Sequence, residues 1–184
     1  MKTSTSNQYA ALHGFYVGIM MISVSLVFYL TTGFLISEKG FSSWAPTVLF
    51  ITGLYFFTRQ YRNKFFPTDF SFSSAFKVAF LIGLYADIII TFFYYLLFKY
   101  TPELLHQMLL MSQKTFQESG MSDKELETMM KTLQTFLTPG LAAFSNFFGI
   151  LIQTTLASLI ISIILRRKTQ DTTSGYDRDM ANIE

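Results

Sequence analysis

Residues 140–165 read GLAAFSNFFGILIQTTLASLIISIIL and contain no acidic or basic side chain. As a helix that rises about 1.5 Å per residue, this segment extends for about 39 Å, which exceeds the thickness of a bilayer's hydrocarbon core. Arg166, Arg167 and Lys168 follow directly and end the apolar run. The segment therefore predicts a membrane-spanning helix.

The rest of the chain has the same apolar character. Hydrophobic residues make up 51% of the 184 residues, and charged residues make up only 14%, against roughly 25% in soluble domains. Three more segments are predicted to span the membrane, at about 15–36, 44–58 and 75–98. Segment 44–58 is the shortest, and we expect Pro46 in its first turn, where a missing N–H costs little. This pattern excludes a soluble globular protein and a disordered one.

Lysine and arginine residues beside the spans predict the orientation. If the N-terminus is inside, nine of these residues lie inside and five lie outside, and cytoplasmic loops carry the excess. The inner set is Lys2, Arg59, Arg62, Lys64, Lys77, Arg166, Arg167, Lys168 and Arg178, and the outer set is Lys39, Lys99, Lys114, Lys124 and Lys131. Both termini are therefore predicted to be cytoplasmic.

An amphipathic helical hairpin is predicted at about 102–137, between the third and fourth spans. Pro102 follows a capping hydroxyl and starts the first helix, and Gly120 ends it. Ser122 and Glu125 form a capping box for the second helix. With both termini inside, the hairpin lies outside. Residues 169–184 are polar with alternating charges and predict a disordered cytoplasmic tail.

The hairpin carries a candidate partner face at Met108, Met129, Met130 and Phe116. Methionine side chains are unbranched and polarizable, which suits an adaptable binding surface. The alternative is that the apolar stripe packs on the bundle or lies in the outer leaflet. The sequence leaves open whether the hairpin rests on the membrane or stands in water. A membrane-protein partner or a second copy of the chain would be the ligand of such a face.

A candidate polar site is predicted near the middle of the membrane. Asp87 lies about halfway along its span, where an ionised carboxylate costs about 2.5–3.5 kcal/mol. Thr91 lies one turn further on and shares the face of Asp87. Gln153 and Ser23 lie near the middle of their own spans, so we expect them at the same depth in the membrane as Asp87. The site either binds a proton or cation, with Asp87 titrating, or holds a protonated Asp87 that fixes the helix register.

Small and aromatic residues predict how the helices pack. Gly14/Gly18, Ser145/Gly149 and Ser158/Ser162 are small-residue pairs at four-residue spacing, and we expect them to pack helices within the chain. Aromatic residues gather near the inner end of the second and third spans and predict an interfacial belt at headgroup depth. They are Tyr55, Phe56, Phe57, Tyr61, Phe65, Phe66, Phe70 and Phe72.

No catalytic, metal or cofactor site is predicted. The chain has no cysteine, and its two histidines, His13 and His106, lie on opposite sides of the membrane in the predicted topology. No H-E-x-x-H, G-x-S-x-G or P-loop pattern is present. The mild net charge of +2 comes from clusters beside the spans and does not indicate a nucleic-acid partner.

Three segments carry a family resemblance. They are FSFSSAFK at 70–77, GMSDKELE at 120–127, and SLIISIIL at 158–165, which directly precedes Arg166, Arg167 and Lys168. With the short second span, they make residues 9–168 similar to the bacterial membrane protein family catalogued as domain of unknown function 4199. The resemblance implies a bacterial inner-membrane setting and supplies no activity and no site residues.

Together these observations predict an all-α protein with one transmembrane domain at 1–168, a four-span helix bundle with an outer hairpin. The predicted role is that of a non-enzymatic structural or accessory protein that works through its hairpin and its lipid-facing surface. The alternative is a small transporter or ion-conducting protein that uses Asp87.

Overall fold

The computed structural model describes residues 2–32, 41–66 and 68–167, and within these ranges the fold is helical, without a named strand. The helices, in chain order, are α1 (Lys2–Thr32), α2 (Phe41–Phe65), α3 (Phe72–Tyr100), α4 (Pro102–Glu118), α5 (Asp123–Phe136) and α6 (Pro139–Leu165). The predicted all-α fold is therefore confirmed for the described part of the chain.

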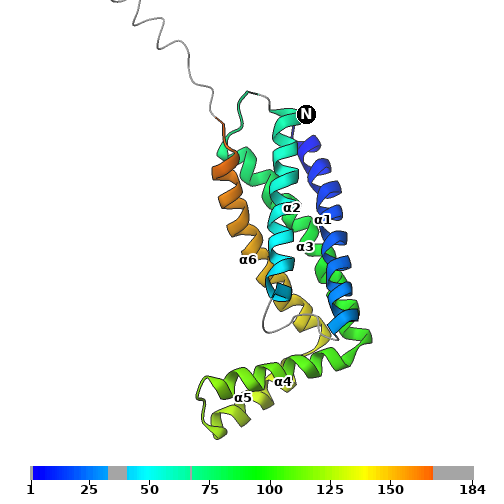
Figure 1. The fold of residues 1–184 in the computed structure, drawn as a ribbon, viewed down its shortest axis with the longest axis vertical. Helices are drawn as coiled ribbons and strands as arrows, with labels where there is room; N and C mark the ends of the chain where they lie inside the picture. The colour runs from blue at the N-terminus through cyan, green and yellow to red at the C-terminus, as the bar shows by residue number, and fades with distance from the viewer. Residues whose placement is uncertain (1, 33–40, 67, 168–184) are drawn as a thin grey trace, which may run out of the picture.

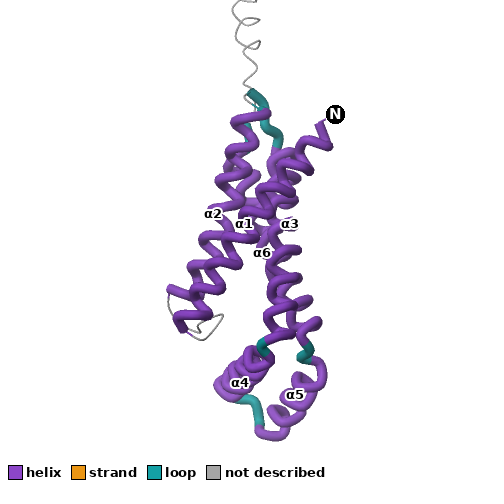
Figure 2. Tube along the Cα trace, turned by 90° about the vertical axis from the view of Figure 1, so that its right-hand side faces the viewer, coloured by secondary structure: helices purple, strands orange, loops and turns teal. Residues whose placement is uncertain are grey.

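Helices α1, α2, α3 and α6 run side by side as a bundle, and the α4–α5 hairpin lies across one end of it (Figure 1). α3 is the central helix, and its most extensive contacts are with α6 and α1. The start of α1 and the end of α6 lie at the opposite end from the hairpin in both views (Figures 1 and 2). The hairpin therefore projects from the end of the bundle where α3 stops and α6 begins.

Three helical segments are long and apolar enough to cross a membrane, judged by length and composition: Ser6–Thr31, Phe72–Tyr100 and Pro139–Leu165. Large apolar side chains on their surfaces are exposed, including Leu30 (79%) and Ile152 (62%). Exposed apolar surface of this extent is typical of a membrane-facing protein. The remaining predicted span lies within α2, which is not one of these three segments.

The helices extend beyond the predicted spans. α1 begins at Lys2, well before residue 15, because its polar first turns contain no proline and continue the helix. α2 begins at Phe41, so Pro46 lies inside the helix and not in its first turn. There the missing N–H removes one helical hydrogen bond. The predicted end of the first span at residue 36 and the predicted tail at 169–184 lie outside the described residues.

Small residues bring α1 close to α3 and α6 close to the core, as predicted. A Cβ atom added at Gly14 would lie 2.6 Å from the carbonyl oxygen of Ile82. One added at Gly18 would lie 3.3 Å from the carbonyl oxygen of Ala86. The pair on α6, Ser158 and Ser162, is fully buried. These contacts lie within the chain and let the helix backbones approach closely.

The bundle is closed at the end opposite the hairpin by contacts between distant segments. An antiparallel bridge joins Phe70 and Arg167, whose backbone N–H groups donate to each other's carbonyl oxygens at 3.1 and 2.9 Å. The Nη1 of Arg62 donates to the carbonyl oxygen of Leu165 at 3.4 Å. Because the last carbonyls of a helix lack partners within it, this contact completes the end of α6.

Two of the aromatic residues predicted to lie at headgroup depth are buried among other side chains. Tyr61 is 4% exposed and Phe70 is fully buried. Phe70 packs against Phe66 with ring centroids 5.3 Å apart, and Tyr61 packs against Tyr9 at 4.9 Å. These two rings therefore contribute to the packing of the bundle end, and their depth in a membrane stays a prediction.

The hairpin forms as the local signals predict. Gly120 lies between α4 and α5 with a φ of +79°, a left-handed conformation that favours glycine. The Glu125 carboxylate accepts hydrogen bonds from the Ser122 hydroxyl at 2.6 Å and from its backbone N–H at 3.1 Å. These hydrogen bonds hold the pKa of Glu125 below its usual value. The capping box therefore fixes the start of α5.

Candidate functional site

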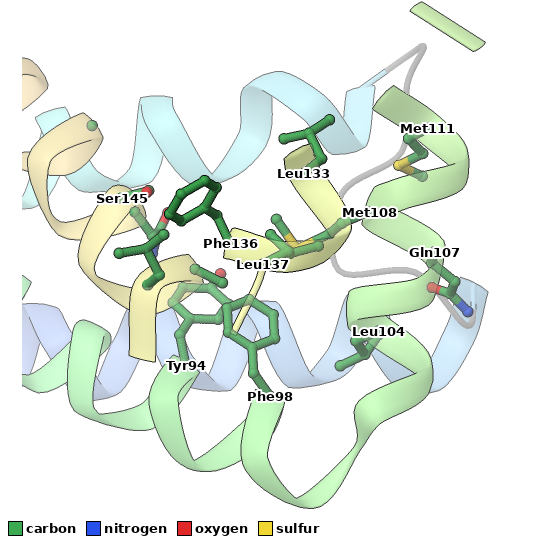
Figure 3. A pocket seen from close by; sticks show the side chains of 14 residues that line it. Tyr94, Phe98, Leu104, Gln107, Met108, Met111, Leu133, Phe136, Leu137 and Ser145 are labelled. Carbon is green, nitrogen blue, oxygen red and sulfur yellow. The ribbon is translucent and has the colours of Figure 1, made fainter. Parts of the chain in front are cut away.

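A cavity of about 480 Å³ lies where the hairpin meets the bundle (Figure 3). Its walls come from α3, α4, α5 and α6, so no single helix forms it. The lining residues are Tyr94, Phe98, Leu104, Gln107, Met108, Met111, Leu133, Phe136, Leu137, Leu141, Ala142, Ser145, Asn146 and Gly149. Small-molecule sites in proteins have volumes of about 300–1,000 Å³ and mostly apolar walls. By size and lining, this cavity belongs to that class.

Two proline turns position the hairpin over the cavity. Pro102 starts α4 directly after α3, and Pro139 starts α6 after α5. The Thr138 hydroxyl caps α6 by accepting a hydrogen bond from the Leu141 backbone N–H at 3.3 Å. These sharp turns direct α4 and α5 across the end of the bundle (Figure 1). The apolar faces of the hairpin helices then meet α3 and α6 and enclose a space with them.

Aromatic and aliphatic side chains face one another across the cavity. Figure 3 shows Tyr94 and Phe98 of α3 on one side, with Phe136 at the end of α5 and the following Leu137 opposite them. Of the residues that line the cavity, Met108, Phe136 and Leu141 are also exposed, by 38%, 61% and 45%. The rim is therefore mostly apolar where it reaches the surface, with Ser145 as an exposed polar residue.

The polar groups of the cavity are few and uncharged. Gln107, Ser145, Asn146 and the Tyr94 hydroxyl supply them, and none of the described lining residues is acidic or basic. The Tyr94 hydroxyl is hydrogen-bonded to the Ser25 hydroxyl of α1 at 3.3 Å. The Nδ2 of Asn146 is buried and has no hydrogen-bond partner among the described residues. A buried donor without a partner is unfavourable, and a ligand with an acceptor could satisfy it.

The pair Ser145 and Gly149 contributes to this cavity instead of to helix packing. Both residues are exposed on α6 and line the cavity. A Cβ atom added at Gly149 would meet nothing within 4 Å, unlike one at Gly14 or Gly18. The prediction that this pair packs two helices is therefore wrong.

The hairpin residues predicted as a partner face do not share one surface hollow. Met108 lines the large cavity. Met130 lines a second hollow on the hairpin, together with charged residues such as Glu127. Met129 is 44% exposed and Phe116 is half-buried, and neither lines a described cavity. The sequence did not single out Asn146 or Phe136 as site residues, and the available signal was that Asn146 is a polar residue within the apolar segment 140–165.

Asp87 is fully buried in α3. The Thr91 hydroxyl donates to its Oδ1 at 3.3 Å, and Oδ2 has no hydrogen-bond partner among the described residues. Two buried hydroxyls of α6, on Thr154 and Ser158, also lack partners there. Thr154 contacts Gly83, which lies one turn before Asp87. The α3–α6 interface therefore holds several polar groups that are only partly satisfied.

The structure brings together only some of the predicted polar site. Asp87 and Thr91 are hydrogen-bonded to each other. Ser23 is exposed, and its hydroxyl donates to the carbonyl oxygen of Ile19 in its own helix at 2.9 Å. Gln153 is half-buried and directly precedes Thr154. The sequence analysis did not include Thr154 and Ser158 in the polar site, because spacing alone does not show which polar side chains of α6 are buried.

No metal site accompanies these groups. Within residues 2–32, 41–66 and 68–167, no group of three or more His, Asp or Glu side chains is placed to hold a metal ion. The arrangement offers an uncharged apolar cavity and a buried carboxyl group, and these two features are separate.

The comparisons with known proteins give a family and no activity. No match to a curated protein or to a solved structure was found. Residues 12–167, most of the chain, match the model of a protein family. That family carries the description "Protein of unknown function (DUF4199)". The chain therefore belongs to the DUF4199 family of proteins of unknown function.

Proposed function

We propose that this protein is a non-enzymatic accessory protein of the membrane that binds an apolar group at the junction of its hairpin and its bundle. One observation carries the proposal: four helices enclose an apolar cavity of about 480 Å³ that opens through a mostly apolar rim. Among the residues that the structure describes, the lining has no acid, base or cysteine, the side chains that usually perform proton transfer or nucleophilic attack. Binding without chemistry is the role that fits such a lining.

The proposal includes a four-span topology in a bacterial inner membrane. α2 runs alongside the other bundle helices (Figure 1) and extends over 25 residues, or about 37 Å, which suits a fourth span. The excess of Lys and Arg beside the bundle end opposite the hairpin supports cytoplasmic termini. In this arrangement the hairpin and the cavity lie at the outer surface.

Photo-crosslinking in native membranes tests the binding role. A photoreactive amino acid at position 108 or 136 is expected to give a discrete adduct, because both side chains line the cavity. The same amino acid at position 129 serves as the matched control, because Met129 lies on the hairpin but outside the cavity. If all three positions give the same diffuse products, the cavity is not a binding site and the proposal fails.

A second candidate function is proton or cation transport through Asp87. The buried Oδ2 without a partner favours it, because a carboxyl group kept only for structure would be expected to have its hydrogen bonds satisfied. Liposomes that contain the purified protein should then show an ion flux that Asp87→Asn abolishes. Thr91→Val is the matched control, since it removes the hydrogen bond to Asp87 but keeps the carboxyl group. A flux that is unchanged by Asp87→Asn would exclude this function.

The same residue gives a stability prediction. Asp87→Leu is expected to leave the free energy of unfolding unchanged or to raise it by about 1 kcal/mol, because the substitution removes a buried oxygen without a partner and only one side-chain hydrogen bond. Unfolding of both proteins in the same detergent measures the difference. A loss of more than about 2 kcal/mol would show that Asp87 holds the helices in register instead.

A further inference from the structure

We infer that the cavity between the hairpin and the bundle holds one hydrocarbon chain of a membrane glycerophospholipid, with an oxygen of that lipid accepting a hydrogen bond from Asn146. The inference rests on the proposed binding role of the cavity and names its ligand. The described side chains that form the walls are mostly aromatic and aliphatic, and each of them is uncharged. Burying hydrocarbon against such a lining is favourable in free energy, because apolar surface is removed from water. The lining offers no opposite charge to an ionic ligand.

The position of the cavity favours a ligand that comes from the bilayer. Leu141, Ser145 and Gly149 form its wall on α6, and all three are exposed. The exposed face of α6 continues through apolar residues such as Phe148 and Ile152. α6 is itself long and apolar enough to cross a membrane. The cavity therefore opens onto the surface that lipid chains cover, and a chain can enter without passing through water.

Size and hydrogen bonding narrow the occupant further. A helix of a partner protein has a diameter of about 10–12 Å and would not fit in a space of about 480 Å³. One flexible hydrocarbon chain fits such a space. The unpartnered Nδ2 of Asn146 is itself covered, so the Asn146 amide must rotate toward the cavity to reach a ligand. There an ester or phosphate oxygen, which a pure hydrocarbon lacks, would satisfy it. A glycerophospholipid supplies both the chain and the acceptor.

Two glycine substitutions on α6 test the inference. Gly149→Phe should fill the cavity, because a side chain there meets open space within the lining. Gly140→Phe is the matched control, because Gly140 also faces open space but lies outside this cavity. After purification in mild detergent, native mass spectrometry should find one retained glycerophospholipid on the wild type and on Gly140→Phe. Gly149→Phe should reduce that retained fraction at least roughly tenfold.

Asn146→Leu tests the hydrogen bond separately from the shape. It keeps the volume of the side chain and removes the donor, so we expect retention to fall roughly tenfold while the helical circular dichroism is unchanged. If Asn146→Leu retains lipid as the wild type does, Asn146 does not contact the ligand. If Gly149→Phe retains lipid as Gly140→Phe does, the lipid lies outside the cavity and the inference is overturned.

Labelling of the wild type keeps the test valid if Gly149→Phe fails to fold. Vesicles would contain phosphatidylethanolamine with a diazirine near the end of one acyl chain. We expect labelled peptides to include Met108 and Phe136, at several times the yield of the exposed Ile160 and Ile164 on α6. Equal yields at the two sets would indicate surface lipid only and overturn the inference.

The crosslinking and labelling experiments together separate the two proposals. A discrete protein adduct from position 108, without lipid labelling there, would keep the binding function and overturn the lipid assignment. The absence of both a discrete adduct and cavity labelling would overturn both. A discrete lipid adduct at positions 108 and 136 would support both.

Discussion

Replacement of Gly14 by valine is expected to lower the free energy of unfolding by about 3 kcal/mol, the upper part of the range for overpacked helix contacts. A Cβ atom at this position would lie 2.6 Å from the Ile82 carbonyl oxygen and 2.6 Å from Tyr85 Cβ. A backbone oxygen cannot rotate away, so α1 would have to move from α3. Unfolding of the purified protein in detergent–denaturant mixtures measures the loss.

Gly149→Val is the matched control for this experiment. It introduces the same β-branched side chain into a helix, with the same small loss of rotamer freedom, but into open space. Gly18→Val should fall between the two, because its nearest contacts would be 3.2–3.3 Å. If Gly14→Val and Gly149→Val lose the same stability, the close approach of α1 to α3 does not hold in the folded protein.

Local sequence signals predicted the helices and the hairpin well. Pro102 and Pro139 fix where α4 and α6 begin, and Gly120 with the capping box of Ser122 fixes the turn between α4 and α5. Each of these signals acts over a few residues, so a single sequence contains all the information it needs. The helix ends were harder, because polar residues without proline extend a helix beyond its apolar part, as in α1.

The candidate site could not be predicted in the same way. Its walls come from α3, α4, α5 and α6, and whether Tyr94 faces the hairpin depends on the angle at which the hairpin leaves the bundle. Ser145 and Gly149 have the same spacing as Gly14 and Gly18, yet one pair borders empty space and the other touches a backbone. The four-residue spacing shows that two small residues share one face of a helix, but it does not show what lies opposite that face.

The second large effect is expected at the α3–α6 interface. Gly83→Ala should lower the free energy of unfolding by about 2–3 kcal/mol, because a Cβ atom there would overlap the Thr154 methyl group and lie 3.1 Å from its hydroxyl oxygen. Thr154 is fully buried and β-branched, so its side chain has little freedom to move. The loss should exceed the gain of up to about 1 kcal/mol that alanine brings to a helix.

Thr154→Ala should rescue this loss, since it removes both the methyl group and the hydroxyl that the Cβ atom introduced by Gly83→Ala would meet. The remaining contact, 3.3 Å to Thr154 Cβ, requires a shift of only a few tenths of an ångström. A double-mutant cycle should therefore give a coupling free energy of about 2 kcal/mol between the two positions. Gly149→Ala is the control, because its Cβ atom would lie in open space and the variant measures only the stability that alanine adds to a helix. Additive losses from the two substitutions would mean that Gly83 and Thr154 are not in contact. The polar groups around Asp87 would then have to be placed against a different face of α6.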